Sequence, residues 1–112
     1  MKIQESAENY LETILILSER HPAVRSIDIA EELTVTRPSV SVAMKNLREN
    51  GYIRMDGGVI TLTERGRTIA ETMYERHLLL SRWLMQLGVD EKTAVEDACR
   101  MEHVISLSLI HI

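Results

Sequence analysis

Cys99, Glu102 and His103, near the C-terminal end of the sequence, combine a thiol, a carboxylate and an imidazole within five positions. On a helix, Glu102 and His103 would both lie one turn after Cys99, so the three groups would share one side. These groups are good ligands for a first-row transition metal. Because the pattern is short, it also fits a buried cysteine beside a surface pair of Glu and His. These three residues alone therefore do not establish a metal site, and the hypothesis depends on whether other parts of the sequence offer further ligands.

Two other parts of the sequence offer such residues. His77 precedes the apolar run 78–80 in a long helical segment, from which it could face the helix that carries Cys99. Asn9 and Glu12 are three residues apart on an earlier helical segment, so their side-chain oxygens share one face. The candidate metal ligands thus come from three predicted helices.

The composition is typical of one folded domain without a membrane span. The chain has 112 residues, of which 45% are hydrophobic and 27% charged, and its net charge is −4. Its longest apolar runs are a few residues, and its first residues lack the apolar stretch of a signal peptide. Its single cysteine cannot form an internal disulfide, which suits the reducing cytosol. We therefore expect a cytoplasmic protein with no membrane partner.

Basic residues gather in one stretch of this acidic chain. Between Arg37 and Arg54 the charged residues are Arg37, Lys45, Arg48 and Arg54 against Glu49 alone. A small basic patch on an acidic body fits a protein that binds DNA selectively. It also fits an ordinary solvated helix face, so charge alone does not decide between the two.

Hydrophobic periodicity predicts three helices in the first half of the sequence, over residues 6–19, 27–33 and 37–49. Ser26 is the expected N-cap of the second helix and Thr36 that of the third, whose first turn holds Pro38. Asn50 and Gly51 are expected to end the third helix. The two later helices are separated by a turn of a few residues.

The period then changes from helical to β-type. Short runs at 52–55 and 59–62 flank the turn residues 56–58, which predicts a hairpin. Thr63 is expected to cap a long helix that ends near residue 87, before Gly88. Asp90 is expected to begin a last helix that runs through Glu102 and His103 to about Ser106. The predicted fold class is mostly α with one small β-hairpin.

Three helices followed by a β-hairpin form a winged helix-turn-helix, in which the third helix is placed to enter a major groove. Simple core packing of these helices is the alternative, but the caps, the short turn and the hairpin agree with one another. Arg37 can donate two hydrogen bonds to guanine, hydroxyls can reach bases or phosphates, and the other basic side chains can neutralise phosphate. The candidate DNA-binding residues are Thr36, Arg37, Pro38, Ser39, Ser41, Lys45, Arg48 and Arg54.

Several short motifs together resemble one family. The chain is similar to the diphtheria toxin repressor family of metal-dependent transcriptional regulators, which includes iron-responsive repressors and manganese transport regulators. The resemblance extends from Ser6 to Ser106. The motifs that carry it are Ser6-Ala7-Glu8-Asn9-Tyr10-Leu11-Glu12, Asp28-Ile29-Ala30, Pro38-Ser39-Val40-Ser41, Leu62-Thr63-Glu64-Arg65-Gly66, Arg76-His77 and Cys99-Arg100-Met101-Glu102-His103-Val104.

The resemblance implies an Fe(II) or Mn(II) site with ligands from the first, fourth and fifth helices. The matching residues in this sequence are Glu12, His77, Cys99, Glu102 and His103. Asn9 stands where manganese-type members have Asp and iron-type members have Met, so it counts as a ligand only through its side-chain oxygen. Cys99 matches the iron type and Glu12 the manganese type. Since a thiolate strengthens binding of Fe(II) more than of Mn(II), we expect Fe(II), with Mn(II) as the alternative.

The resemblance also implies a homodimer that, once loaded with metal, binds palindromic double-stranded operators and controls genes of metal homeostasis. The ion would act by favouring the DNA-competent arrangement of the protein. Residues 1–66 would then form the winged-helix DNA-binding domain, and 67–112 the metal-binding and dimerisation helices. The apolar residues expected to serve the dimer are Leu80, Trp83, Leu84 and Leu87.

The last residues depart from the family. Members continue after the position of Ser106 with a polar, acidic turn and at least one more helix, whereas residues 107–112 carry no acidic or basic side chain apart from one histidine. We therefore expect a C-terminally truncated member with an incomplete dimerisation region and an atypical tail from about residue 107.

Two other functions compete with this prediction. A winged-helix regulator with a degenerate metal site, not controlled by metal, is the alternative that Asn9 keeps open. An enzyme such as a small metallohydrolase would need an open coordination position and a general base, but the sequence contains no His-Glu-x-x-His run. We therefore expect a metal-dependent repressor, with neither an enzymatic activity nor a small organic substrate.

Overall fold

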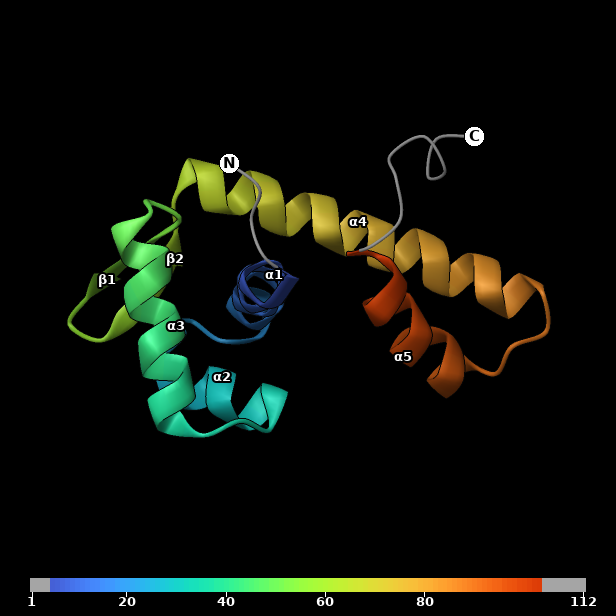
Figure 1. Cartoon of the computed structure of the whole chain (residues 1–112), viewed down its shortest axis with the longest axis horizontal. Helices are drawn as coiled ribbons and strands as arrows, with labels where there is room; N and C mark the ends of the chain where they lie inside the picture. Colours follow the sequence, from blue (N-terminus) through green and yellow to red (C-terminus); the bar gives the residue numbers. More distant parts are fainter. Residues whose placement is uncertain (1–4, 104–112) are drawn as a thin grey trace. The chain divides into compact units, whose positions relative to one another are not determined.

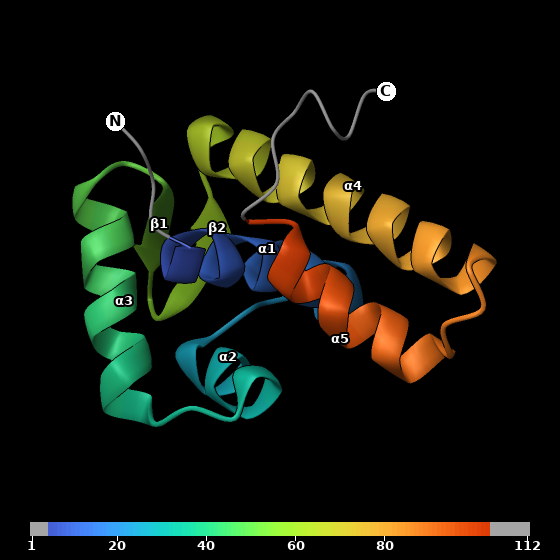
Figure 2. The same cartoon turned by 45° about the vertical axis from the view of Figure 1, so that its right-hand side comes forward.

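The computed structural model describes residues 5–103 of the chain, as five helices and one antiparallel hairpin (Figures 1 and 2). This architecture confirms the predicted fold class. The chain divides into two units, Met1–Glu71 and Thr72–Ile112. The elements are α1 (Glu5–Arg20), α2 (Ser26–Leu33), α3 (Arg37–Glu49), β1 (Ile53–Asp56), β2 (Val59–Leu62), α4 (Glu64–Gln86) and α5 (Glu91–Met101).

The first unit is built around a core to which every one of its elements contributes. Figure 2 shows α3 beside α1 and the hairpin, in agreement with the contacts of α1, α2, β1 and β2 with their neighbours. Apolar residues three or four apart place one stripe of each helix in this core, because that spacing puts them on one face. The largest fully buried apolar side chains are Leu11, Ile14, Ile29, Val40, Met44 and Ile53. This core fixes the face that α3 turns to solvent.

The helix-turn-helix differs from the prediction at one cap. The N-cap of α2 is Arg25, and Ser26 is already the first helical residue. The carboxylate of Asp28 accepts a 2.9 Å hydrogen bond from the Arg25 amide, which satisfies an amide at this end without a serine cap. At the other end Thr34 lies in the left-handed region with φ 55°. The Val35 amide then reaches the Ala30 carbonyl at 3.1 Å and closes the helix.

Helix α3 begins and ends as the sequence predicts. The Thr36 hydroxyl accepts a hydrogen bond from the Ser39 amide, and Pro38 occupies the first turn. The helix ends at Glu49, and Gly51 then takes a positive φ of 78°. The local chemistry of these few residues is enough to define both ends.

The hairpin turns through Gly57 and Gly58, and Asp56 pairs with Val59. The prediction placed Asp56 in the turn, whereas it is the last residue of β1. Both glycines have positive φ, 58° and 83°, as a two-residue hairpin turn requires. Before α2, Val24 adds a one-residue bridge to the outer edge of β2, with the Ile60 amide 2.8 Å from the Val24 carbonyl.

The start of α4 packs closely on the start of the hairpin. The Thr63 hydroxyl accepts from the Gly66 amide at 3.2 Å and donates to the Gly51 carbonyl at 2.7 Å. A Cβ at Gly66 would lie 2.0 Å from the Tyr52 carbonyl oxygen, so only glycine fits this contact. The beginning of α4 thereby belongs to the first unit.

The second unit contains the rest of α4 and all of α5. Gly88 follows α4 with φ 96°, and Asp90 caps α5 by accepting a 3.0 Å hydrogen bond from the Thr93 amide. Helix α5 ends at Met101, so the prediction that it runs through His103 was wrong within the described residues; its continuation to Ser106 lies outside them. None of the helices in residues 5–103 is long and apolar enough to cross a membrane.

Candidate functional site

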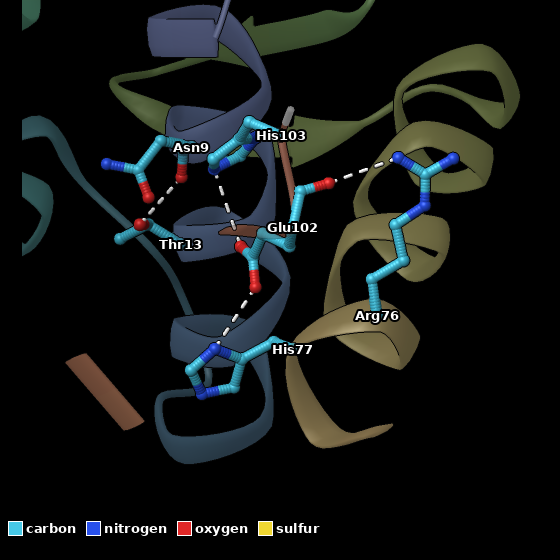
Figure 3. Close-up of polar contacts among 6 residues, drawn as sticks. All are labelled: Asn9, Thr13, Arg76, His77, Glu102 and His103. Carbon is cyan, nitrogen blue, oxygen red and sulfur yellow. Dashed lines mark hydrogen bonds and ion pairs between the residues drawn. The ribbon is translucent and has the colours of Figure 1, made fainter. Parts of the chain in front are cut away.

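Glu102, directly after α5, holds a fully buried carboxylate between two imidazoles of the second unit (Figure 3). Its Oε2 lies 3.1 Å from Nδ1 of His77 on α4, and its Oε1 lies 3.4 Å from Nε2 of His103. The His77 side chain is 18% exposed and that of His103 only 2%. The position of the Glu102 backbone is set by Arg76, whose Nη1 donates a 3.1 Å hydrogen bond to its carbonyl. One carboxylate and two imidazoles therefore converge in a nearly dry environment.

This arrangement is compatible with metal ligation. Two ligand atoms that bind one ion at about 2.1 Å and at right angles are about 3.0 Å apart. The separation of 3.1 Å between His77 Nδ1 and Glu102 Oε2 is close to that value. Imidazole suits iron, zinc and nickel, whereas carboxylate suits manganese, so a mixed set fits a first-row divalent ion. The same contacts also fit a hydrogen-bonded ion pair that joins α4 to the end of α5.

Cys99 lies in the last turns of α5, three residues before Glu102, and is partly exposed. His77 and His103 each contact the Glu102 carboxylate, and Cys99 lies close to Glu102 and His103 in the chain. Ligation by Cys99 stays a prediction.

Glu12 and Asn9 are on α1, in the first unit. Glu12 is 4% exposed, and Asn9 is partly exposed one turn earlier. The Asn9 backbone carbonyl accepts a 2.8 Å hydrogen bond from the Thr13 hydroxyl (Figure 3), which leaves the Asn9 side chain out of that contact. A buried carboxylate needs a partner or a cation to offset its desolvation. That Glu12 and Asn9 are metal ligands also stays a prediction.

All eight predicted DNA-binding residues lie on the surface of the first unit. Arg54 is on β1, Thr36 is the cap of α3, and the other six are on α3 itself: Arg37, Pro38, Ser39, Ser41, Lys45 and Arg48. Every one of them is exposed. The six on α3 lie on the part of the helix that the core does not cover.

Two of the predicted hydroxyls are already engaged with each other. The Thr36 hydroxyl donates a 2.9 Å hydrogen bond to Ser39 Oγ while it accepts from the Ser39 amide. Local capping therefore accounts for the Thr36 hydroxyl. The Ser39 hydroxyl keeps its own hydrogen, which can be donated to a phosphate oxygen.

Three exposed residues near this surface were missed by the sequence analysis. Arg65 donates to the Asn50 carbonyl at 3.2 Å and to the Tyr52 hydroxyl at 3.3 Å, and its guanidinium lies 4.7 Å from the centre of the Tyr52 ring. Arg25 is hydrogen-bonded to the hairpin turn. Val42 is an exposed valine on α3. A break in the apolar stripe of α3 could have revealed Val42, whereas the arginine contacts depend on residues far along the chain.

Comparison with known proteins identifies the family. Residues 2–57 match the model of the iron-dependent repressor N-terminal DNA-binding domain. Residues 63–111 match that of the iron-dependent repressor metal-binding and dimerisation domain. A helix-turn-helix transcriptional regulator of Methanocaldococcus jannaschii, itself uncharacterised, is 35% identical over 107 residues, which cover 93% of this chain and 86% of the relative. The regulator MntR of Geobacillus kaustophilus is 36% identical over 107 residues, which cover 94% of this chain and 75% of that regulator.

Two solved structures agree with the sequence relatives. The manganese regulator SloR matches with a TM-score of 0.83 and 30% identity, over 99% of this chain and 52% of that one. A manganese-dependent transcriptional repressor in complex with manganese matches with a TM-score of 0.86 and 32% identity. The match covers 94% of this chain and 49% of that one. This chain thus spans about half the length of these two structures. On these matches, the chain belongs to the iron-dependent repressor family of metal-dependent transcriptional regulators.

Proposed function

We propose that this chain binds operator DNA through its winged helix when a divalent metal occupies a site that includes His77, Glu102 and His103. The observation that carries the proposal is the buried Glu102 carboxylate between two imidazoles. A bound ion would take the place of the protons shared between Glu102 and the two imidazoles. Its positive charge would offset the cost of burying the carboxylate. Cys99 is proposed as a further ligand, and the family resemblance adds Glu12 and, through its side-chain oxygen, Asn9.

The choice of metal rests on two opposing arguments. Two similar structures are named for manganese, which favours Mn(II). The Cys99 thiolate favours Fe(II), because soft sulfur binds Fe(II) more strongly than Mn(II). We propose Mn(II) as the activating metal and Fe(II) as the alternative. When bound, either ion supplies a positive charge that neutralises the ligands; the chain's own residues bind the DNA.

We further propose that residues 1–66 contact DNA and that residues 67–112 bind metal and a second copy of the chain. The exposure of Arg37, Ser39, Lys45, Arg48 and Arg54 supports the first assignment. Exposed apolar side chains on α4 support the second. A symmetric pair of winged helices would require a palindromic operator in double-stranded DNA. We propose that the protein acts in the cytoplasm and has no enzymatic function.

The test measures metal and DNA binding on the same preparation. Anaerobic titration calorimetry with Mn(II) and Fe(II) should give binding to the wild-type chain, and Glu102→Gln should weaken it at least 100-fold, since a ligand charge is removed. Glu96→Gln, which changes an exposed carboxylate on α5, is the matched control and should bind as wild type. Fluorescence anisotropy with DNA from the gene's own promoter should show binding that is lost with chelator and restored by Mn(II).

A second function is favoured by the same contacts. If His77, Glu102 and His103 form only an ion pair, they join α4 to the end of α5 without metal, and the chain is a winged-helix regulator that metal does not control. Calorimetry without a metal signal, together with promoter binding that is unchanged after exhaustive chelation, would establish this alternative. Absence of DNA binding under every condition would overturn both.

A further inference from the structure

Val42 projects from α3 into solvent with 62% of its surface exposed. Among the large apolar residues described, only Leu87 is more exposed, at 66%. The buried residues of the same helix are Val40, Met44 and Leu47, each at most 4% exposed. Val42 therefore contributes nothing to the core of the first unit.

Helix geometry places Val42 at the middle of the solvent face. At about 100° per residue, it lies about 200° around the helix from Val40 and about 200° from Met44. Its neighbours one turn away are Pro38 and Ser39 before it and Lys45 and Asn46 after it, and all four are exposed. A single isopropyl group thus stands among polar and charged side chains.

Helix stability does not explain a valine at this position. Valine has a lower helix propensity than alanine, lysine or glutamate, because its β-branch restricts χ1 against the preceding turn. Its exposed apolar surface is also unfavourable in water. Neither the core nor helix propensity accounts for this valine, and its surroundings indicate which kind of molecule it could contact.

A protein groove that binds a helix contacts apolar residues that recur one turn apart along one side of that helix. The stripe through Val42 instead contains Asn46 and Glu49. The basic residues of α3 and β1 are Arg37, Lys45, Arg48 and Arg54, against the acids Glu49 and Asp56, and Lys45 lies one turn from Val42. An exposed apolar group on a mainly basic helix matches a major groove, where the 5-methyl group of thymine lies between two phosphate backbones.

We propose that Val42 reads the 5-methyl group of a thymine in the operator half-site, and so determines sequence preference at one A·T pair. The inference rests on the proposed DNA-binding function and deepens it. The basic residues of α3 and β1 would supply affinity that is independent of sequence, whereas Val42 would distinguish thymine from cytosine, which lacks the methyl group.

The experiment replaces the methyl group alone. A duplex is first selected from a randomised pool with the full chain and Mn(II), and each thymidine in it is then exchanged for deoxyuridine. Wild-type affinity should fall about four-fold at one thymine per half-site, the effect of one methyl group no longer buried. Val42→Ala should bind the thymine duplex about four-fold more weakly and should show no further loss with deoxyuridine at that position. Alanine favours the helix, so circular dichroism should report an unchanged fold.

Two further variants separate methyl reading from general effects. Val42→Thr keeps one methyl group and the β-branch, so it should retain most of the deoxyuridine effect. Lys45→Ala should weaken binding to all duplexes alike while the four-fold effect persists. Loss of the effect in Lys45→Ala but not in Val42→Ala would overturn the proposal.

The outcomes also distinguish this inference from the function on which it rests. If no duplex is enriched by the wild-type chain, the proposed DNA-binding function fails, and the inference with it. If a duplex is enriched but deoxyuridine has no effect at any position, the function stands and the inference is overturned. A deoxyuridine effect that persists in Val42→Ala likewise assigns the methyl contact to another residue.

Discussion

Arg25 and Gly57, 32 residues apart in the sequence, are joined by a 3.1 Å hydrogen bond from the guanidinium Nη1 to the carbonyl oxygen. The same guanidinium nitrogen lies 2.9 Å from where a Cβ at Gly58 would be. Because Arg25 is also the N-cap of α2, this contact holds the tip of the hairpin against the start of the helix-turn-helix. This hydrogen bond adds to the core packing and to the Val24–Ile60 bridge in holding the hairpin that carries Arg54.

Arg25→Ala should loosen the hairpin and weaken DNA binding. An exposed hydrogen bond contributes about 1 kcal/mol, so hydrogen exchange at the Ile60 amide should accelerate about five-fold. Arg25→Lys keeps the positive charge but not the planar guanidinium. Its Ile60 amide should therefore exchange as fast as in Arg25→Ala, while the variant should lose less DNA affinity. Arg20→Ala removes an arginine bound to Glu32, away from the hairpin, and should leave Ile60 exchange unchanged. Equal exchange in wild type and Arg25→Ala would contradict the role.

Metal affinity should fall steeply as the pH is lowered from 8 to 5.5. Protons compete with the ion for the imidazoles of His77 and His103, so binding releases protons and is favoured at higher pH. Calorimetry in buffers of different ionisation enthalpy should measure this proton release directly. His21→Ala, on an exposed histidine of the first unit, is the control and should leave the pH dependence unchanged. A pH-independent affinity would exclude the two histidines as ligands.

Asp90 should make the second unit less stable as the pH falls into the acid range. The Thr93 amide, which donates to its carboxylate at 3.0 Å, holds the pKa of Asp90 below its ordinary value of 3.8. A lowered pKa contributes stability above pH 3.8, and this is lost as the pH falls through the folded-state pKa. Asp90→Asn keeps a capping side chain and should reduce the difference between unfolding at pH 7 and pH 3. Asp90→Ala should destabilise the unit at pH 7, and urea unfolding measures both.

Trp83 and Leu87 should determine whether the chain associates with itself. They are 48% and 66% exposed on and just after α4. Burying a large apolar side chain contributes about 2 kcal/mol, so the double variant Trp83→Ala, Leu87→Ala should raise a dimer dissociation constant at least 100-fold. Sedimentation velocity over a range of concentrations measures this. Arg82→Ala changes an exposed neighbour and should sediment as wild type. Unchanged association in the double variant would place the dimer contact elsewhere.

The features that could be predicted from sequence are those set by neighbouring residues. Thr36 and Asp90 were identified as caps because a cap depends on the next three residues. His77 was expected to face the segment that carries Cys99, and its contact with Glu102 agrees with that expectation. The N-cap at Arg25 was missed, although Asp28 three residues later takes part in it, because Ser26 is a residue type that commonly caps helices. The end of α5 was placed too late, and the Glu102 carbonyl just after it accepts from Arg76, a contact between residues 26 apart that no local pattern indicates.

The left-handed Thr34, between the two helices of the helix-turn-helix, has a consequence for engineering this protein. A β-branched residue at φ 55° is strained by about 1 kcal/mol, whereas glycine adopts this conformation freely. The greater freedom of glycine in the unfolded chain offsets part of the gain. Thr34→Gly should therefore raise the midpoint of thermal unfolding by a few degrees, with DNA affinity unchanged, as a thermal melt and anisotropy would show. The turn between α2 and α3 is thus a position where a more stable variant can be made without altering any of the proposed DNA-binding residues.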